Sequence, residues 1–192
     1  MRESDEIFAG RARTLNRRSL LKSGAACAAG LLLGGGPACA RLLAPPKTLA
    51  FYNLHTGERV KTEFSAGGDF IPEALTRINR VLRDHRTNEI HPIDTDLLEL
   101  LFALQRQTGA RGEFHVISGY RSPASNAKLQ AAGSGVATRS LHMSGKAIDI
   151  ALPGCSLADL RRAALRLRGG GVGYYPSSGF VHVDTGRVRQ WA

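Results

Sequence analysis

The sequence is short of cysteines, and this shortage excludes a disulfide-stabilised scaffold. Of its three cysteines, Cys27 and Cys39 lie within the first 40 residues, which leaves Cys155 alone in the rest of the chain. A single thiol cannot form an intramolecular disulfide. Cys155 follows Pro153-Gly154 and has no base next to it, so it is also a poor candidate for a catalytic nucleophile.

Acidic residues are also scarce, and the chain carries a formal net charge of +10. Residues 1–40 hold six basic and three acidic side chains, so the remainder keeps 20 basic against 13 acidic residues, a net charge of +7. Such a surplus favours polyanionic partners, which include nucleic acids, membrane surfaces and anionic cell-wall polymers. No basic run is interleaved with aromatic residues and no nucleic-acid motif is present, so we expect no nucleic acid as a partner.

The first 40 residues lack an apolar run long enough to cross a bilayer, yet they are built like an export signal. The pair Arg17-Arg18 precedes a short run rich in Ala, Gly and Leu at residues 23–36. This run is shorter than the roughly 20 apolar residues that span a membrane. Ala38-Cys39-Ala40 then supplies the small residues that signal peptidase prefers. The whole segment resembles a twin-arginine signal.

An ordinary secretory signal, and a lipoprotein signal with Cys39 as the lipidated residue, are the alternatives for this segment. We therefore predict a twin-arginine signal peptide at residues 1–40, a linker at 41–47 and a single domain at 48–192. The protein is expected in the periplasm or another cell-wall compartment, without a stable membrane span once the signal is cleaved. The sequence leaves the oligomeric state open.

The rest of the chain has neither internal repeats nor low-complexity stretches, and its pattern predicts an α+β fold. Helices precede most of the strands, so we expect a small, mainly antiparallel sheet with the helices packed on one side. The predicted strands are 48–54, 59–64, 114–117, 146–152, 172–175 and 180–184. The predicted helices begin at 72 and at about 94, follow 123 as far as 129, and cover 157–167.

Histidine and aspartate recur at two places where strand geometry exposes them. His142 lies in a loop before the strand that contains Asp149, and alternation puts Asp149 opposite two isoleucines and between two alanines. His182 and Asp184 share one face of the last predicted strand in the same way. Two histidines and a carboxylate are typical ligands of catalytic zinc, with the fourth position left for water. On spacing alone, a buried Asp hydrogen-bonded to a His explains the pattern equally well.

Four motifs occur in order along the chain: residues 118–123 read SGYRSP, 140–149 read SLHMSGKAID, 171–175 read GVGYY and 180–184 read FVHVD. Together they resemble the LAS-type zinc D-Ala-D-Ala peptidase superfamily, which takes in lysostaphin, VanX-like dipeptidases and the fold of hedgehog signalling domains. The chain after the signal is similar as a whole to the twin-arginine-exported murein endopeptidase branch of that superfamily. This wider similarity includes residues 53–58, residues 82–86 and the end at Trp191.

The resemblance implies a hydrolase that uses Zn²⁺ to cut amide bonds in peptidoglycan stem peptides. The metal ligands would be His142, Asp149 and His182, carried by the sheet. The bonds cut would be cross-links, next to D-alanine or between diaminopimelate residues. A D,D-carboxypeptidase and a non-catalytic, zinc-containing cell-wall binding module are the alternatives.

The chain departs from the VanX-like pattern at Gly179, where those enzymes have a general-base Glu three residues before the last histidine. We expect Asp184 to replace that base, because it lies two residues after His182 on the same strand face. The alternative for Asp184 is a carboxylate that only orients His182.

Three further side chains are candidates for contact with the substrate. Arg121 follows a Gly-Tyr turn that leads into the expected site, where its fixed charge would bind a substrate carboxylate or the developing oxyanion. An arginine that only caps the loop is the alternative. Ser140 and Tyr120 are the other two candidates.

Overall fold

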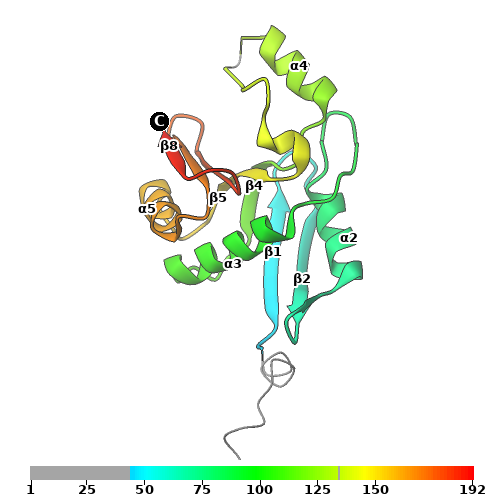
Figure 1. The fold of residues 1–192 in the computed structure, drawn as a ribbon, viewed down its shortest axis with the longest axis vertical. Helices are drawn as coiled ribbons and strands as arrows, with labels where there is room; N and C mark the ends of the chain where they lie inside the picture. Colours follow the sequence, from blue (N-terminus) through cyan, green and yellow to red (C-terminus); the bar gives the residue numbers. More distant parts are fainter. Residues whose placement is uncertain (1–43, 134) are drawn as a thin grey trace, which may run out of the picture. The chain divides into compact units, whose positions relative to one another are not determined.

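Eight strands form one sheet in the computed structural model, which describes residues 44–133 and 135–192 (Figure 1). The expected signal peptide lies outside these residues. The strands are β1 (Lys47–Asn53), β2 (Arg59–Ala66), β3 (Asp69–Phe70), β4 (Phe114–Ser118), β5 (Ala147–Ala151), β6 (Gly171–Tyr175), β7 (Phe180–Asp184) and β8 (Arg189–Trp191).

The strand order across the sheet is β3-β2-β1-β4-β5-β7-β6-β8. Two neighbouring pairs, β1–β4 and β6–β8, are parallel, and the other pairs are antiparallel. The predicted α+β class and the mainly antiparallel sheet are therefore confirmed. The sheet is larger than expected because the first hairpin, β1–β2, joins it through the β1–β4 pair and β8 extends its other edge.

The helices begin and end close to the predicted residues, because capping side chains mark their ends. The side chain of Asp94 accepts a hydrogen bond from the backbone of Asp96 at the start of α3, and Gly109 ends that helix in the left-handed conformation. None of the described helices is both long and apolar enough to cross a membrane. The helices are α2 (Pro72–Val81), α3 (Thr95–Thr108), α4 (Pro123–Ala131) and α5 (Leu157–Leu167), and a 3₁₀ turn, η1, covers Leu141–Ser144.

Three elements are absent from the sequence-based prediction: β3, β8 and η1. They contain between two and four residues each, too few for a periodicity of either 2 or 3.6 to show. Each predicted helix and strand is present, with bounds that differ by no more than about two residues.

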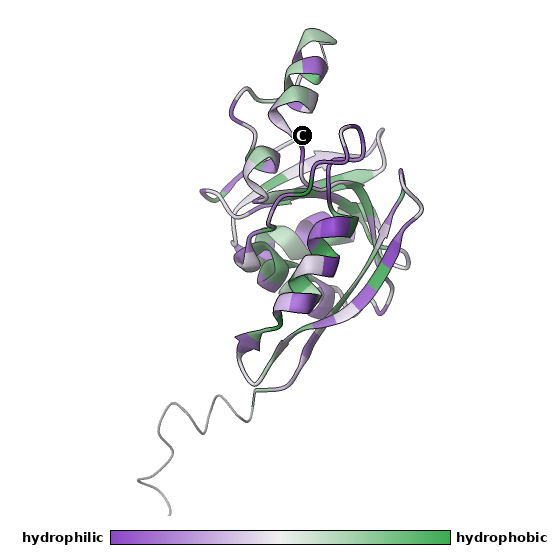
Figure 2. Ribbon diagram, turned by 90° about the vertical axis from the view of Figure 1, so that its right-hand side faces the viewer, coloured by the Kyte–Doolittle hydropathy of each residue, from purple (hydrophilic) through white to green (hydrophobic). Residues whose placement is uncertain are grey.

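The hydrophobic core lies between one face of the sheet and the helices α2, α3 and α5. Alternate strand residues such as Phe51, Val116 and Ile150 are fully buried there, and Leu98 and Leu160 pack on them from the helices. Green and purple segments alternate along the helices in Figure 2, as expected of helices that bury one side. Helix α4 extends away from the sheet (Figure 1). The predicted packing of helices on one side is confirmed, and the opposite face of the sheet is left for other side chains.

Gly145 joins the 3₁₀ turn η1 to the start of helix α3. It ends η1 with a φ of 67°, and its carbonyl accepts a hydrogen bond of 3.0 Å from the backbone N–H of Asp94. A Cβ atom at this position would overlap the carbonyl oxygen of Pro92. Only glycine satisfies both the backbone conformation and the close approach. Since η1 carries His142, this contact also sets where that histidine lies.

We expect Gly145→Ala to destabilise the fold by more than the strain of its backbone conformation. A left-handed alanine costs about 1–2 kcal/mol, and the overlap with Pro92 adds about 1–3 kcal/mol. Gly109→Ala is the matched control, because Gly109 has a φ of 69° with open space around its would-be Cβ. Urea unfolding followed by circular dichroism measures both losses. Equal losses for the two variants would contradict the packing role of Gly145.

Candidate metal and active site

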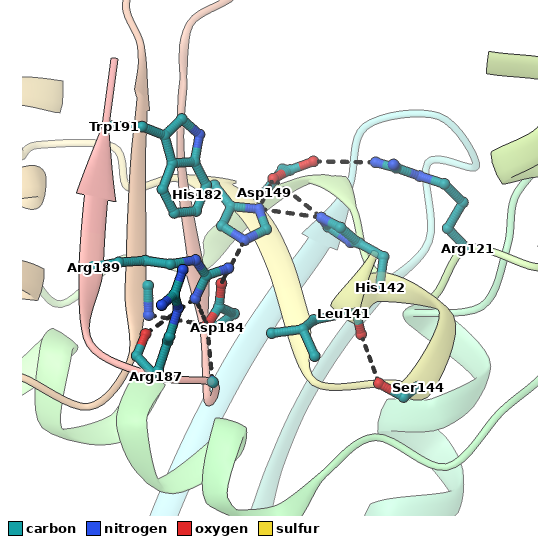
Figure 3. A network of polar contacts seen from close by, with 12 residues as sticks. Arg121, Leu141, His142, Ser144, Asp149, His182, Asp184, Arg187, Arg189 and Trp191 are labelled. Carbon is teal, nitrogen blue, oxygen red and sulfur yellow. Dashed lines mark hydrogen bonds and ion pairs between the residues drawn. The ribbon is translucent and has the colours of Figure 1, made fainter. Parts of the chain in front are cut away.

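Three potential metal ligands converge on the face of the sheet opposite the core. Asp149 on β5 pairs directly with His182 on β7, and their Oδ1 and Nδ1 atoms lie 2.8 Å apart. His142 reaches them from η1, with its Nε2 3.2 Å from His182 Nδ1 and 3.4 Å from Asp149 Oδ1 (Figure 3). Their donor atoms all lie within 4.8 Å of one another, and this is the one such group of three or more found among residues 44–133 and 135–192.

Each histidine has its second ring nitrogen occupied by an acceptor. Nδ1 of His142 donates to the carbonyl oxygen of Gly119 at 2.7 Å, and Nε2 of His182 donates to Oδ2 of Asp184 at 3.1 Å. A carbonyl oxygen only accepts, so its partner assigns the proton of a neutral His142 to Nδ1 and leaves the lone pair on Nε2. His182 has a carboxylate at each nitrogen, and with Nε2 donating to Asp184 its Nδ1 would offer a lone pair to a metal ion bound beside Asp149. This arrangement fits a divalent cation with nitrogen and oxygen ligands, such as zinc.

The carboxylate between the two rings is held in its charged form. Asp149 is 6% exposed. Burial by itself would raise its pKa, but His142 and His182 outweigh burial and hold the pKa of Asp149 well below its usual range. Arg121 adds an ion pair, with Nη2 3.6 Å from Oδ2 of Asp149. An ionised carboxylate is the form that coordinates a metal ion.

Asp184 is fully buried and hydrogen-bonded through both oxygens. Oδ1 accepts from the backbone N–H groups of Gly171 and Gly186, at 2.9 and 2.8 Å. Arg189 donates to Oδ1 at 3.1 Å and to Oδ2 at 2.7 Å, and His182 donates to Oδ2. These partners outweigh burial and hold the pKa of Asp184 well below its usual range.

The imidazole of His182 lies between Asp184 and Asp149, since its two nitrogens bond to one carboxylate each (Figure 3). Asp184 is thus on the far side of the ring from the converging lone pairs. Its contacts favour the orienting role over the role of general base, the two possibilities that the sequence leaves open. The same two carboxylates raise the pKa of His182, against the effect of burial, which lowers it.

Arg121 is held close to the ligands by the loop that precedes α4. Its backbone N–H donates to the carbonyl of His142 at 3.2 Å. Its guanidinium is almost wholly buried, and its Nη atoms lie 3.4 Å from the side chains of Asn126 and Ser118. The Nε atom of Arg121 has no hydrogen-bond partner among the described residues. Arg121 also lines the cavity over the ligands, so its guanidinium is suited to donate a hydrogen bond to an oxygen of a bound molecule.

A cavity of about 470 Å³ opens over these side chains. The structure brings most of the residues predicted for the site to its lining: Arg121, Ser140, His142, Asp149, His182 and Asp184.

Tyr120 does not join the residues that line the cavity. Its hydroxyl donates to Glu89 at 2.6 Å, and its ring stacks on His91 with the centroids 4.7 Å apart. The side chain is 4% exposed. Its contacts therefore point to packing of the loop rather than to the predicted contact with the substrate.

Sequence reasoning did not identify Arg189, whose guanidinium fixes Asp184, or Trp191, whose ring centroid lies 5.2 Å from that of His182. Both belong to the short strand β8, which pairs with β6. The signal that could have indicated them is the pair Gly171 and Gly173, two residues apart on β6, because glycines on one face of a strand leave room for side chains from the next strand.

The chain is similar to known proteins over most of its length. Residues 42–191 match the family model Peptidase_M15_2, described as Peptidoglycan L,D-endopeptidase MepK. The chain is 46% identical over 181 residues to Peptidoglycan L,D-endopeptidase MepK of Escherichia coli (strain K12). The aligned region covers 92% of this chain and 97% of that protein. It is 45% identical over 147 residues to Probable peptidoglycan L,D-endopeptidase MepK of Haemophilus influenzae (strain ATCC 51907 / DSM 11121 / KW20 / Rd), with 76% and 79% of the two chains covered.

One solved structure, that of Serratia marcescens L-Ala D-Glu endopeptidase ChiX, is 25% identical, with 40% of this chain and 62% of that chain covered. The TM-score is 0.32. The family model and the two relatives cover most of the chain and agree with one another. The chain belongs to the Peptidase_M15_2 family, the family described as Peptidoglycan L,D-endopeptidase MepK.

Proposed function

We propose that this protein is an exported zinc metallopeptidase that hydrolyses cross-links in peptidoglycan stem peptides. The observation that carries the proposal is the convergence of three donor atoms, Nε2 of His142, Oδ1 of Asp149 and Nδ1 of His182, at the floor of an open cavity. Relatives that share almost half of the sequence are named for endopeptidase activity on peptidoglycan. Their name specifies an L,D linkage, which we propose as the linkage that this protein cuts.

In this proposal His142, Asp149 and His182 hold the zinc ion. A zinc ion at such a site polarises a carbonyl and lowers the pKa of its bound water to about 7. Arg121, which lines the cavity and pairs with Asp149, binds the carbonyl oxygen as negative charge develops on it. Asp184, held by Arg189, keeps the proton of His182 on Nε2 and the lone pair of Nδ1 directed at the metal.

The rest of the proposal concerns substrate and location. Ser140 borders the cavity and is placed to contact the peptide. The net charge of +7 after residue 40 favours association with anionic wall material. We propose a twin-arginine signal at residues 1–40, a linker at 41–47 and the catalytic domain at 48–192. The signal delivers the enzyme to the periplasm. An endopeptidase named for L,D bonds is favoured over a D,D-carboxypeptidase by the relatives.

Purified protein loaded with zinc is expected to release stem-peptide products from isolated peptidoglycan, as detected by mass spectrometry. A chelator should abolish the release, and His142→Ala should lose both bound zinc and turnover because one ligand is missing. His55→Ala is the control, since His55 is exposed and lies outside the cavity lining. The proposal is wrong if the wild-type protein releases nothing while His142→Ala retains a full complement of zinc. Tight wall binding without turnover would instead establish a non-catalytic module.

Asp184→Asn distinguishes an orienting carboxylate from a general base. If Asp184 orients His182, zinc affinity should fall about 10–100-fold, and most of the activity should return when zinc is raised to saturation. Arg189→Gln should act in the same direction, because Arg189 reaches the site only through Asp184. A general base would give normal zinc affinity and a kcat lowered by about 10²–10⁴-fold at every zinc concentration. Zinc titration with activity measured at each point separates the two outcomes.

A further inference from the structure

The side chain of Trp191 reaches the candidate metal site from β8, the edge strand of the sheet. It crosses the neighbouring strand β6 at Gly173, which has no side chain. Gly173 on β6 pairs with Trp191 on β8 and with His182 on β7. A Cβ atom on Gly173 would lie 2.7 Å from the indole ring of Trp191. The glycine therefore leaves the space in which the indole lies over β6 and approaches His182 (Figure 3).

The indole is held in place on several sides. Its Nε1 donates to the hydroxyl of Tyr175 at 2.7 Å, and the guanidinium of Arg189 lies 4.9 Å from its ring centroid. Tyr175 in turn stacks on Phe180, with the ring centroids 4.6 Å apart. Trp191, Tyr175 and Phe180 all line the cavity. One side of the cavity is therefore a fixed aromatic wall that begins next to a metal ligand, and such surfaces bind aliphatic groups well.

A cation without a partner lines the same cavity from a different segment. Arg139 is exposed and precedes the turn that carries His142. Within the described part of the chain, no residue forms a hydrogen bond or ion pair with its guanidinium. The other two arginines of the lining are already paired, Arg121 with Asp149 and Arg189 with Asp184. Arg139 is thus the guanidinium that remains available to an anionic group in the cavity.

We propose that the aromatic wall and Arg139 form a specificity subsite for an aliphatic residue whose side chain ends in a free carboxylate. The aliphatic chain would lie against Trp191 while the carboxylate binds the guanidinium of Arg139. The subsite borders the metal ligands, so the residue that it holds is one of the two that flank the scissile amide. This inference rests on the proposed peptidase function, since it names a feature of the substrate of that same site.

The test compares two synthetic cross-linked peptides that differ only at the side-chain carboxylate, which is free in one and a carboxamide in the other. Wild-type protein is expected to favour the free carboxylate by about three- to tenfold in kcat/KM, mainly through KM. Arg139→Gln should cleave both peptides with equal efficiency and bind zinc as the wild type does, and Arg139→Lys should keep part of the preference. Equal kcat/KM for the two peptides in the wild type, or an unchanged preference in Arg139→Gln, overturns the subsite.

Peptide binding, measured separately from cleavage, shows whether the subsite proposal or the peptidase proposal has failed. Trp191 is the only tryptophan of the chain, so its fluorescence reports on this wall directly. If the wild type cleaves neither peptide, the peptidase proposal fails, and fluorescence titration then decides the subsite. Tighter binding of the carboxylate peptide that is lost in Arg139→Gln supports it, and equal binding overturns it.

Gly173→Ala is expected to displace the indole and remove the aromatic wall while all three ligand side chains stay unchanged. The tryptophan emission should shift to longer wavelength and be quenched more readily by acrylamide, and KM should rise for both peptides. Gly179→Ala is the control for loss of a hairpin glycine, because Gly179 has a left-handed φ of 75° but open space around its would-be Cβ, so any strain there leaves the indole in place. If the tryptophan emission of Gly173→Ala shifts to longer wavelength while KM stays unchanged, Trp191 is excluded from the subsite. The KM of Trp191→Phe tests the same contact a second time.

Discussion

The antiparallel pairing of β5 with β7 is the constraint on which the site depends. Its register places Asp149 opposite His182 and, one step along, Ile148 opposite Val183. A shift of β7 by one residue would turn the imidazole of His182 into the core and the side chain of Val183 outward. Burial of Ile148 and its neighbours against the helices therefore also selects the register that joins the two ligands. The register of β5 and β7 therefore determines both the packing of the core and the geometry of the site.

The face opposite the core is organised in rows that run across the strands. One row runs from Trp191 over Gly173 to His182 and Asp149, and the other runs from Arg189 past Gly171 to Asp184. In each row a glycine on β6 lets a side chain of the edge strand reach a side chain of β7. The network leaves the buried charge of Asp184 fully hydrogen-bonded, which is the condition under which a carboxylate is stable in a protein interior. An edge strand of three residues thus supports the candidate metal site from one side.

The loops supply what the sheet does not. His142 stands on a 3₁₀ turn that Gly145 joins to the start of α3, and its ring is oriented by the carbonyl oxygen of Gly119. The same loop holds Arg121 beside Asp149 through a backbone hydrogen bond to His142. Rigid strands carry two of the ligands, and two mutually bonded loops carry the third ligand and the guanidinium. Such a division allows loops to differ among related enzymes while the ligand pair on the sheet is preserved.

The sequence by itself determined the α+β class and nearly all of the helices and strands, because alternation in strands and capping at helix ends are local patterns. The three candidate ligands came from the resemblance of its ordered motifs to a zinc peptidase superfamily, since their spacing alone fits a buried Asp–His pair equally well. The sequence also indicated that Asp184 lies on the same strand face as His182. Only the tertiary structure decided that Asp184 bonds to the outer nitrogen of His182, that Tyr120 packs against His91 and Glu89, and that Arg189 and Trp191 belong to the site. These contacts join strands and loops that are distant in sequence, and strand register and loop docking, which place them, depend on the packing of the whole sheet rather than on any local pattern.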